Sequence, residues 1–105
     1  MTADDTATKA IDLIAAERAR QINEEGYTSE HDARHDGDLA RAAACYAMPA
    51  RGVWLQHAWG APEAWPWERY AWKPTPDDRV RELVKAGALI AAEIDRLLAA
   101  GESDD

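Results

Sequence analysis

The chain has 105 residues, a formal net charge of −8 and a single cysteine, Cys45. This length favours one domain with a small core, and one cysteine excludes an intramolecular disulfide. The acidic balance argues against direct nucleic-acid binding, which needs a basic surface. The N-terminus is acidic, unlike a signal peptide, and no apolar run reaches the roughly 20 residues that span a bilayer. We therefore expect a cytoplasmic protein with no membrane partner.

The expected organisation is a single all-α domain over residues 1–105, with short, disordered acidic tails at about 1–5 and 101–105. The first helix is predicted over residues 6–25, because Ile11, Ile14 and Ile22 recur at helical spacing. Thr6 or Thr8 is its expected cap, and Gly26 is a natural stop.

A second helix is predicted over residues 38–49, with Asp38 as the N-cap. Its apolar face is rich in alanine, which implies the close approach of another helix. This face comprises Leu39, Ala42, Ala43, Tyr46 and Ala47. Cys45 belongs to the same alanine-rich segment and is expected to pack in the core.

A third helix is predicted over residues 77–99, with Thr75 as its cap, Pro76 in its first turn and Gly101 as its stop. A wide apolar face is expected to turn toward the core. It comprises Val80, Leu83, Val84, Gly87, Ile90, Ile94, Leu97 and Leu98.

The segment 51–74 joins the second and third helices and holds all five tryptophans of the chain. A short helical turn is expected at about residues 62–70. The predicted fold is a three-helix bundle with this Trp- and Pro-rich connector folded over it. Because the bundle is small, a homodimer would help to stabilise it.

The stretch "EHDARHDGD", residues 30–38, concentrates groups that bind metals. Its candidate ligands are Glu30, His31, Asp32, His35, Asp36 and Asp38. No cysteine or third spaced histidine supports zinc, whereas the carboxylates suit Mg²⁺ or Mn²⁺. The competing interpretation is a polar loop that caps the second helix.

The end of the first helix carries a second candidate site. Glu17, Arg18, Gln21 and Glu25 lie at spacings that place them on neighbouring helical faces. Carboxylates in this pattern can hold magnesium against a triphosphate. A solvated face with ion pairs such as Glu17 with Arg20 explains the same pattern.

Glu93 lies on the apolar flank of the third helix, where an unpaired carboxylate would be costly. Its candidate partners are Arg18, Lys85, a histidine of the loop and a metal ion. A structural ion pair is the alternative to a ligand site.

The tryptophans are candidates for stacking a nucleobase or anchoring a partner protein. Trp65, Trp67 and Trp72 lie in rigid proline-containing segments, and Lys73 is placed to meet a phosphate. The chain has no phenylalanine, so core packing is the competing role for most of the tryptophans.

Residues 16–98 resemble a group of small proteins of tailed phages and prophages, and the C-terminal part of Ead-like phage early proteins. The motifs are Glu17-Arg18-x-Arg20-Gln21, Glu25-Gly26, Glu30-His31-Asp32, His35, Gly37, Trp65-Pro66-Trp67, Trp72-Lys73-Pro74 and Ala92-Glu93-Ile94. The resemblance implies a phage accessory protein made in the host cytoplasm.

The chain is similar to MazG-like nucleotide pyrophosphohydrolases only in general architecture, an all-α bundle with carboxylates on facing helices. It departs from their carboxylate motif, because Glu24 and Glu25 run into Gly26 and the second helix offers only Asp38.

Three functional hypotheses remain open from the sequence. The chain binds a nucleotide or nucleotide signal, with or without a divalent metal and hydrolysis. Alternatively, it inhibits a host enzyme or defence complex through exposed tryptophans. In the third hypothesis, the polar residues form only an internal network that stabilises the bundle.

Overall fold

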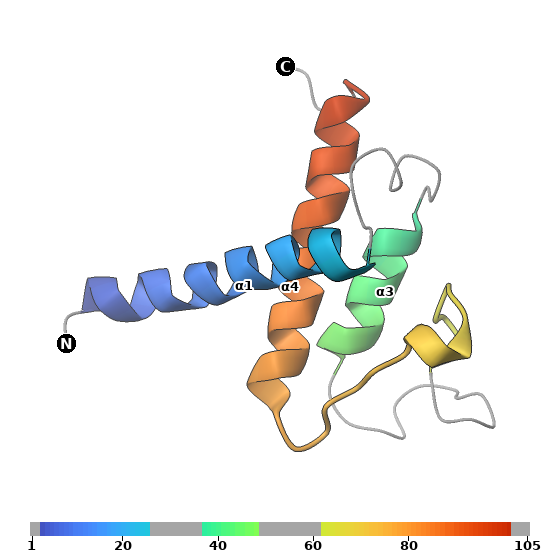
Figure 1. Ribbon diagram of the computed structural model, residues 1–105, viewed down its shortest axis with the longest axis horizontal. Helices are drawn as coiled ribbons and strands as arrows, with labels where there is room; N and C mark the ends of the chain where they lie inside the picture. The colour runs from blue at the N-terminus through green and yellow to red at the C-terminus, as the bar shows by residue number, and fades with distance from the viewer. Residues whose placement is uncertain (1–2, 26–36, 49–61, 102–105) are drawn as a thin grey trace.

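The computed structural model describes residues 3–25, 37–48 and 62–101, with side chains from residue 8 to 24 in the first range. These residues form helices α1 (Ala3–Glu25), α3 (Asp38–Ala47) and α4 (Arg79–Ala99), and a 3₁₀ turn η1 (Arg69–Ala71) (Figure 1). Within these ranges there is no β-strand. The predicted all-α, three-helix bundle is confirmed.

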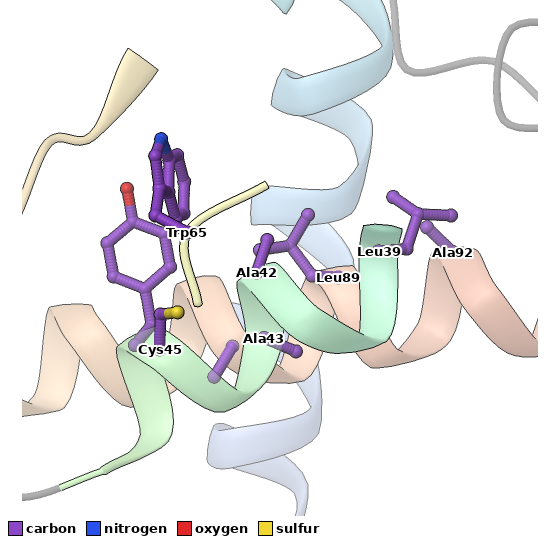
Figure 2. Close-up of a cluster of buried hydrophobic side chains, with 9 residues drawn as sticks. Leu39, Ala42, Ala43, Cys45, Trp65, Leu89 and Ala92 are labelled. Atoms are coloured by element: carbon purple, nitrogen blue, oxygen red, sulfur yellow. The ribbon is translucent and has the colours of Figure 1, made fainter. Parts of the chain in front are cut away.

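Helices α3 and α4 lie side by side and enclose the core (Figure 1). Buried alanines line both helices, and Leu39 and Leu89 are the largest fully buried side chains. Figure 2 shows Leu39 and Ala92 at one end of this contact, and Cys45 and Trp65 at the other. The expected close approach at the alanine face and the core position of Cys45 are both confirmed.

Helix α1 crosses α4 instead of running alongside it (Figure 1). The crossing lies at Gly87, where an added Cβ would come within 2.7 Å of Ile14 Cδ1. The absence of a side chain at Gly87 therefore allows the two helices to approach. The N-terminal half of α1 extends beyond the α3–α4 pair.

The helix boundaries differ from the prediction at three places. Helix α1 begins at Ala3, inside the expected tail. The N-cap of α3 is Gly37, with a φ of 83° that favours glycine, so Asp38 is the first helical residue instead of the cap. Helix α3 ends at Ala47, two residues before the expected end.

The start of α4 also needs correction. Its cap is Asp78, whose carboxylate accepts a hydrogen bond from the Arg81 N–H at 3.0 Å. The expected cap, Thr75, instead donates its hydroxyl to the Asp78 carbonyl at 3.1 Å and its backbone N–H to Glu82 Oε2. The expected stop at Gly101 is confirmed, and this glycine has a φ of 78°.

The predicted orientation of the apolar face of α4 was wrong for most of its length. Val84 is buried, but five other large members are between 47 and 61% exposed: Val80, Leu83, Ile90, Ile94 and Leu98. The face that packs on α3 carries Ala88, Leu89 and Ala92. Small side chains occupy this face because only they allow α4 to approach the alanine-rich face of α3.

The connector is described from Pro62 onward, and residues 51–61 lie outside the described ranges. Trp65 is buried, and Trp67 and Trp72 pack beside it against the core. The short helical turn forms at Arg69–Ala71, at the C-terminal edge of the expected position. No helix in the described ranges is long and apolar enough to cross a membrane.

The crossing at Gly87 can be tested by filling it. We expect Gly87→Val to lower the free energy of unfolding by about 1–2 kcal/mol, because the new methyl groups overlap Ile14. The double variant Gly87→Val/Ile14→Ala should be more stable than the sum of the two single losses predicts. Urea unfolding of the four proteins measures this coupling, and strict additivity would contradict the crossing.

Candidate functional site

A small pocket lies where the C-terminal half of α1, the end of α3, the tryptophan segment and α4 meet. Its cavity of about 30 Å³ has room for about two water molecules. Polar and aromatic side chains line it: Glu17, Arg20, Gln21, Lys73, Lys85, Tyr46, Trp65 and Trp67. Four of the site residues predicted from the sequence, Glu17, Gln21, Lys73 and Lys85, therefore occur together with two of the predicted tryptophans.

Among the described residues of this lining, Glu17 is the only carboxylate, and it is 2% exposed. Arg20 binds it with two nitrogens, Nε to Oε1 at 2.8 Å and Nη2 to Oε2 at 2.7 Å. Arg81 of α4 reaches Oε1 at 2.8 Å, and Gln21 Nε2 donates to Oε2 at 3.2 Å. Both oxygens are thus engaged, and the ion pair with Arg81 joins α1 to α4.

These partners determine the protonation of Glu17. Burial alone would raise its pKa, but the hydrogen bonds and charge of Arg20, together with the charge of Arg81, outweigh burial and lower the pKa below its ordinary value. Glu17 is therefore ionised at neutral pH. Its negative charge is neutralised by two guanidinium groups.

Gln21 brings an unsatisfied acceptor to the pocket. The residue is 3% exposed, and its amide nitrogen is directed to Glu17. This contact fixes the orientation of the amide, because only the nitrogen can donate to a carboxylate. Its Oε1 atom is buried, and no described residue donates a hydrogen bond to it. Such an atom accepts from a water or a ligand donor.

Tyr46 also lines the pocket and contacts the tryptophan segment. Its hydroxyl accepts a hydrogen bond from the Lys73 backbone N–H at 3.1 Å, and its ring stacks on Trp72 with centroids 4.8 Å apart. Arg79 donates to the backbone carbonyls of Tyr46 and Ala47, which fixes the end of α3 to the start of α4.

Lys85 reaches the pocket from α4 and is 8% exposed. Its ammonium donates to the Lys73 carbonyl at 2.6 Å and lies 5.4 Å from the centre of the Tyr46 ring. The ring face and the carbonyl both stabilise the buried positive charge. The Lys73 side chain is exposed at the mouth of the pocket.

The described lining of the pocket is cationic although the chain is acidic. Arg20, Lys73 and Lys85 belong to it, and Glu17, the one carboxylate among these described residues, is already paired with Arg20 and Arg81. This balance suits an anion and opposes a free cation. Aromatic rings next to the positive charges add a surface for a planar ring.

The predicted tryptophans take different roles. Trp65 is 6% exposed, donates its indole N–H to the Glu68 carbonyl at 3.1 Å and contacts Trp67 and Trp72 edge-on, so it belongs to the core. Trp72 stacks on Tyr46 and does not line the pocket. Trp67 is half-buried at the pocket and remains the candidate for stacking.

Glu93 and Arg18 do not join this site. Arg96 of the same helix binds Glu93 with two nitrogens, at 2.8 and 3.0 Å, so among the described residues its partner is Arg96 instead of the expected Arg18 or Lys85. The loop histidines lie outside the described residues. Arg18 lies 3.6 Å from Asp95, on the other flank of α1. Glu93 is an internal ion pair, as the alternative interpretation held.

The loop candidates Glu30, His31, Asp32, His35 and Asp36 lie outside the described residues, as does the side chain of Glu25. Asp38 is half-buried at the start of α3. The described residues contain no group of three His, Cys, Asp or Glu side chains that could hold a metal ion. Glu17, with both oxygens bound by its own neighbours, does not fit a Mg²⁺ or Mn²⁺ ligand.

Sequence reasoning missed the arginines that complete these networks. Arg81 and Arg79 connect α4 to the other helices, and Arg96 neutralises Glu93. The pairing of Glu93 with Arg96 could have been predicted from the sequence, because the two residues lie three positions apart on one helix. No sequence pattern could have predicted the pair of Arg81 with Glu17, since it depends on where α1 crosses α4.

Cys45 is not a reactive group of the site. Burial raises the pKa of its thiol to about 11, although the charge of Arg41 acts in the opposite direction. The thiolate, which is the nucleophilic form, is therefore scarce at neutral pH.

Replacing Glu17 tests the closed network. Because the folded state lowers the pKa of Glu17, its ion pairs stabilise the fold above the unfolded pKa of roughly 4.3 and are lost as the pH falls through the folded pKa. Glu17→Gln should lower the free energy of unfolding by about 2–4 kcal/mol at pH 7. Denaturation from pH 7 to 3 should show this difference shrinking below about pH 4, whereas Glu24→Gln, on the exposed face, should change little. A difference that is independent of pH would argue against the ionised network.

Comparison of the chain with protein-family models, with curated proteins and with solved structures gave no match. The resemblance to phage accessory proteins therefore stays a prediction from sequence motifs.

Proposed function

We propose that the chain binds a nucleotide or nucleotide signal at this pocket and sequesters it. The observation that carries the proposal is the convergence of Arg20, Lys73 and Lys85 with aromatic rings around Glu17, which is already neutralised and is the one carboxylate among the described lining residues. Phosphate needs positive charge, and a nucleobase needs a planar apolar surface. Few other small molecules combine these two requirements.

The lining residues suggest how such a ligand would lie. The enclosed volume of about 30 Å³ is too small for a whole nucleotide, so only one terminal group would enter it. Lys85 and Arg20 would meet a phosphate oxygen there, and exposed Lys73 would meet the next phosphate at the mouth. The base would lie against Trp67 outside the enclosed part.

Gln21 supports a polar ligand in the same place. Its buried Oε1 lacks a donor among the described residues, and a ligand hydroxyl, amino group or bridging water would satisfy it. Because the amide is held by Glu17, this acceptor is already oriented before any ligand arrives.

Sequestration is favoured over hydrolysis by the state of the carboxylates. Metal-dependent hydrolysis of a phosphoanhydride needs carboxylate oxygens free to hold Mg²⁺ or Mn²⁺. Both oxygens of Glu17 are engaged by Arg20, Arg81 and Gln21, and Glu93 is paired with Arg96. A divalent ion would instead accompany the phosphates of the ligand or take ligands from the 25–36 segment.

The motif resemblance supplies a biological setting for the proposal. A phage accessory protein made in the host cytoplasm would gain from removing a nucleotide that signals infection. The alternative, an inhibitor anchored by exposed tryptophans, finds no support in Trp65, which is buried in the core, while Trp54 and Trp59 lie outside the described residues.

Ligand binding can be measured by thermal shift and calorimetry with a panel of mono-, di-, tri- and cyclic nucleotides, each with and without Mg²⁺. We expect at least one nucleotide to raise the melting temperature and to bind more weakly as salt increases. Lys73→Gln should weaken this binding about tenfold, a loss of about 1.4 kcal/mol, without destabilising the fold, because the side chain is exposed.

The matched control is Arg41→Gln, which removes the same charge from the exposed side of α3. Arg41→Gln should leave binding unchanged. Lys85→Gln removes a buried cation of the pocket, so circular dichroism would check that this variant still folds. No response to any nucleotide in the panel, or equal losses in Lys73→Gln and Arg41→Gln, would contradict the proposed site.

A further inference from the structure

The enclosed part of the pocket is small and positively charged, and both properties restrict the group that can enter it. Its volume of about 30 Å³ gives room for about two water molecules. Three cationic side chains, Arg20, Lys73 and Lys85, line the pocket together with one carboxylate, Glu17, so the formal charge of these described residues is +2. A ligand group that fits must therefore be small and must concentrate negative charge on few atoms.

Lys85 supplies the most buried of these positive charges, since it is only 8% exposed. Its ammonium lies against the Lys73 carbonyl and the face of the Tyr46 ring, two groups that stabilise a positive charge without neutralising it. The attraction between opposite charges grows as water is excluded from around them. An anionic group that reaches Lys85 is therefore bound more strongly than one that stays at the mouth beside the exposed Lys73.

We propose that the group that enters beside Lys85 is a terminal phosphate monoester, so that the site takes nucleotides that end in a phosphate and excludes cyclic nucleotides. In a cyclic nucleotide every phosphate is a diester. The inference rests on the proposed nucleotide binding and names the class of nucleotide that the pocket takes.

Shape separates the two kinds of phosphate. The phosphorus of a monoester carries three oxygens with no carbon attached, so two of them can take the room of the two water molecules while the ester oxygen leads out of the pocket. The rest of the nucleotide then lies where the half-buried Trp67 and the exposed Lys73 line the pocket. A diester carries carbon on two of its oxygens, and these carbons flank the phosphorus on both sides. An enclosure of about 30 Å³ has no room for them.

Charge separates the two kinds of phosphate in the same direction. A phosphate monoester carries about −1.5 to −2 charges at neutral pH, which is close to the +2 of the described lining. A diester carries a single negative charge. The Glu17 carboxylate does not cancel this advantage, because Arg20 and Arg81 both bind it and the three side chains together remain positive.

The buried acceptor of Gln21 adds a third difference. Its Oε1 atom accepts a hydrogen bond from no described residue, and Gln21 lines the same pocket. Near neutral pH a monoester still carries a P–OH proton for part of the time, since its second pKa is about 6. This proton can be donated to Oε1 directly or through a water, whereas a diester has no such proton. The acceptor therefore also favours the monoester.

Calorimetry on the wild-type chain tests this choice with three ligands for each of the bases adenine, guanine, cytosine and uracil. They are the 5′-monophosphate, the methyl ester of that monophosphate and the 3′,5′-cyclic monophosphate. The methyl ester is the matched control, because it keeps the base, the sugar and the phosphorus and closes only a terminal oxygen. We expect at least one 5′-monophosphate to bind at least about tenfold more tightly than both its methyl ester and its cyclic form.

Two lysine variants test whether the preference arises in the enclosed part of the pocket. Lys85→Gln should remove most of the difference between the monophosphate and its methyl ester, because it lowers the charge beside the terminal oxygens. Lys73→Gln, at the mouth, should weaken both ligands alike and leave their ratio unchanged. A general loss of stability would also weaken both ligands alike, so it cannot imitate the result expected for Lys85→Gln. An undiminished preference in folded Lys85→Gln would overturn the proposal.

Inorganic phosphate and dimethyl phosphate separate this inference from the proposed function. Binding of inorganic phosphate, without binding of dimethyl phosphate or of any nucleotide, would contradict nucleotide binding and support a pocket for terminal phosphate. A methyl ester or cyclic nucleotide that binds within about tenfold of the monophosphate would overturn the inference and leave nucleotide binding standing. No binding of inorganic phosphate or of any nucleotide would overturn both.

Discussion

The ion pair between Glu17 and Arg81 is the interaction on which the rest of the structure depends. It joins α1 to α4 near their crossing, and the Glu17 carboxylate is almost completely buried. A buried charge is stable only when its hydrogen-bonding capacity is satisfied, and here Arg20 and Gln21 complete the set. Glu17, Arg20 and Gln21 also line the pocket. The network that stabilises the crossing therefore also positions the cationic site.

Small residues explain both the core and the exposed surface. The alanines of α3 and α4 let the two helices pack closely, and Gly87 lets α1 cross next to them. This arrangement turns the larger side chains of α4, such as Ile90 and Ile94, away from the core. The pocket lies near the opposite face of α4, where Lys85 and Leu89 line it.

The sequence predicted the helices well and the contacts between them less well. Helical periodicity, Gly101 and the alanine face of α3 were sufficient for the all-α fold and the α3–α4 contact. The orientation of α4 was missed, because its larger aliphatic face was assumed to be buried. Intrahelical pairing of Glu17 with Arg20 could be predicted from spacing, but the pair with Arg81 could not, since it depends on a crossing angle that no local pattern determines. For the same reason the sequence could not show that both oxygens of Glu17 are engaged, since one of its two arginines comes from a distant segment.

Tryptophan indole resonances offer the most direct test of the central claim, that the pocket binds an anionic ligand with an aromatic ring. In a ¹H–¹⁵N correlation spectrum, assigned with single Trp→Phe variants, a nucleotide is titrated into the protein. The account predicts a saturable shift of the Trp67 indole signal, a smaller shift for buried Trp65, and loss of the effect in Lys73→Gln. A Trp67 signal that stays unchanged at saturating nucleotide, or that shifts equally in Lys73→Gln, would contradict it.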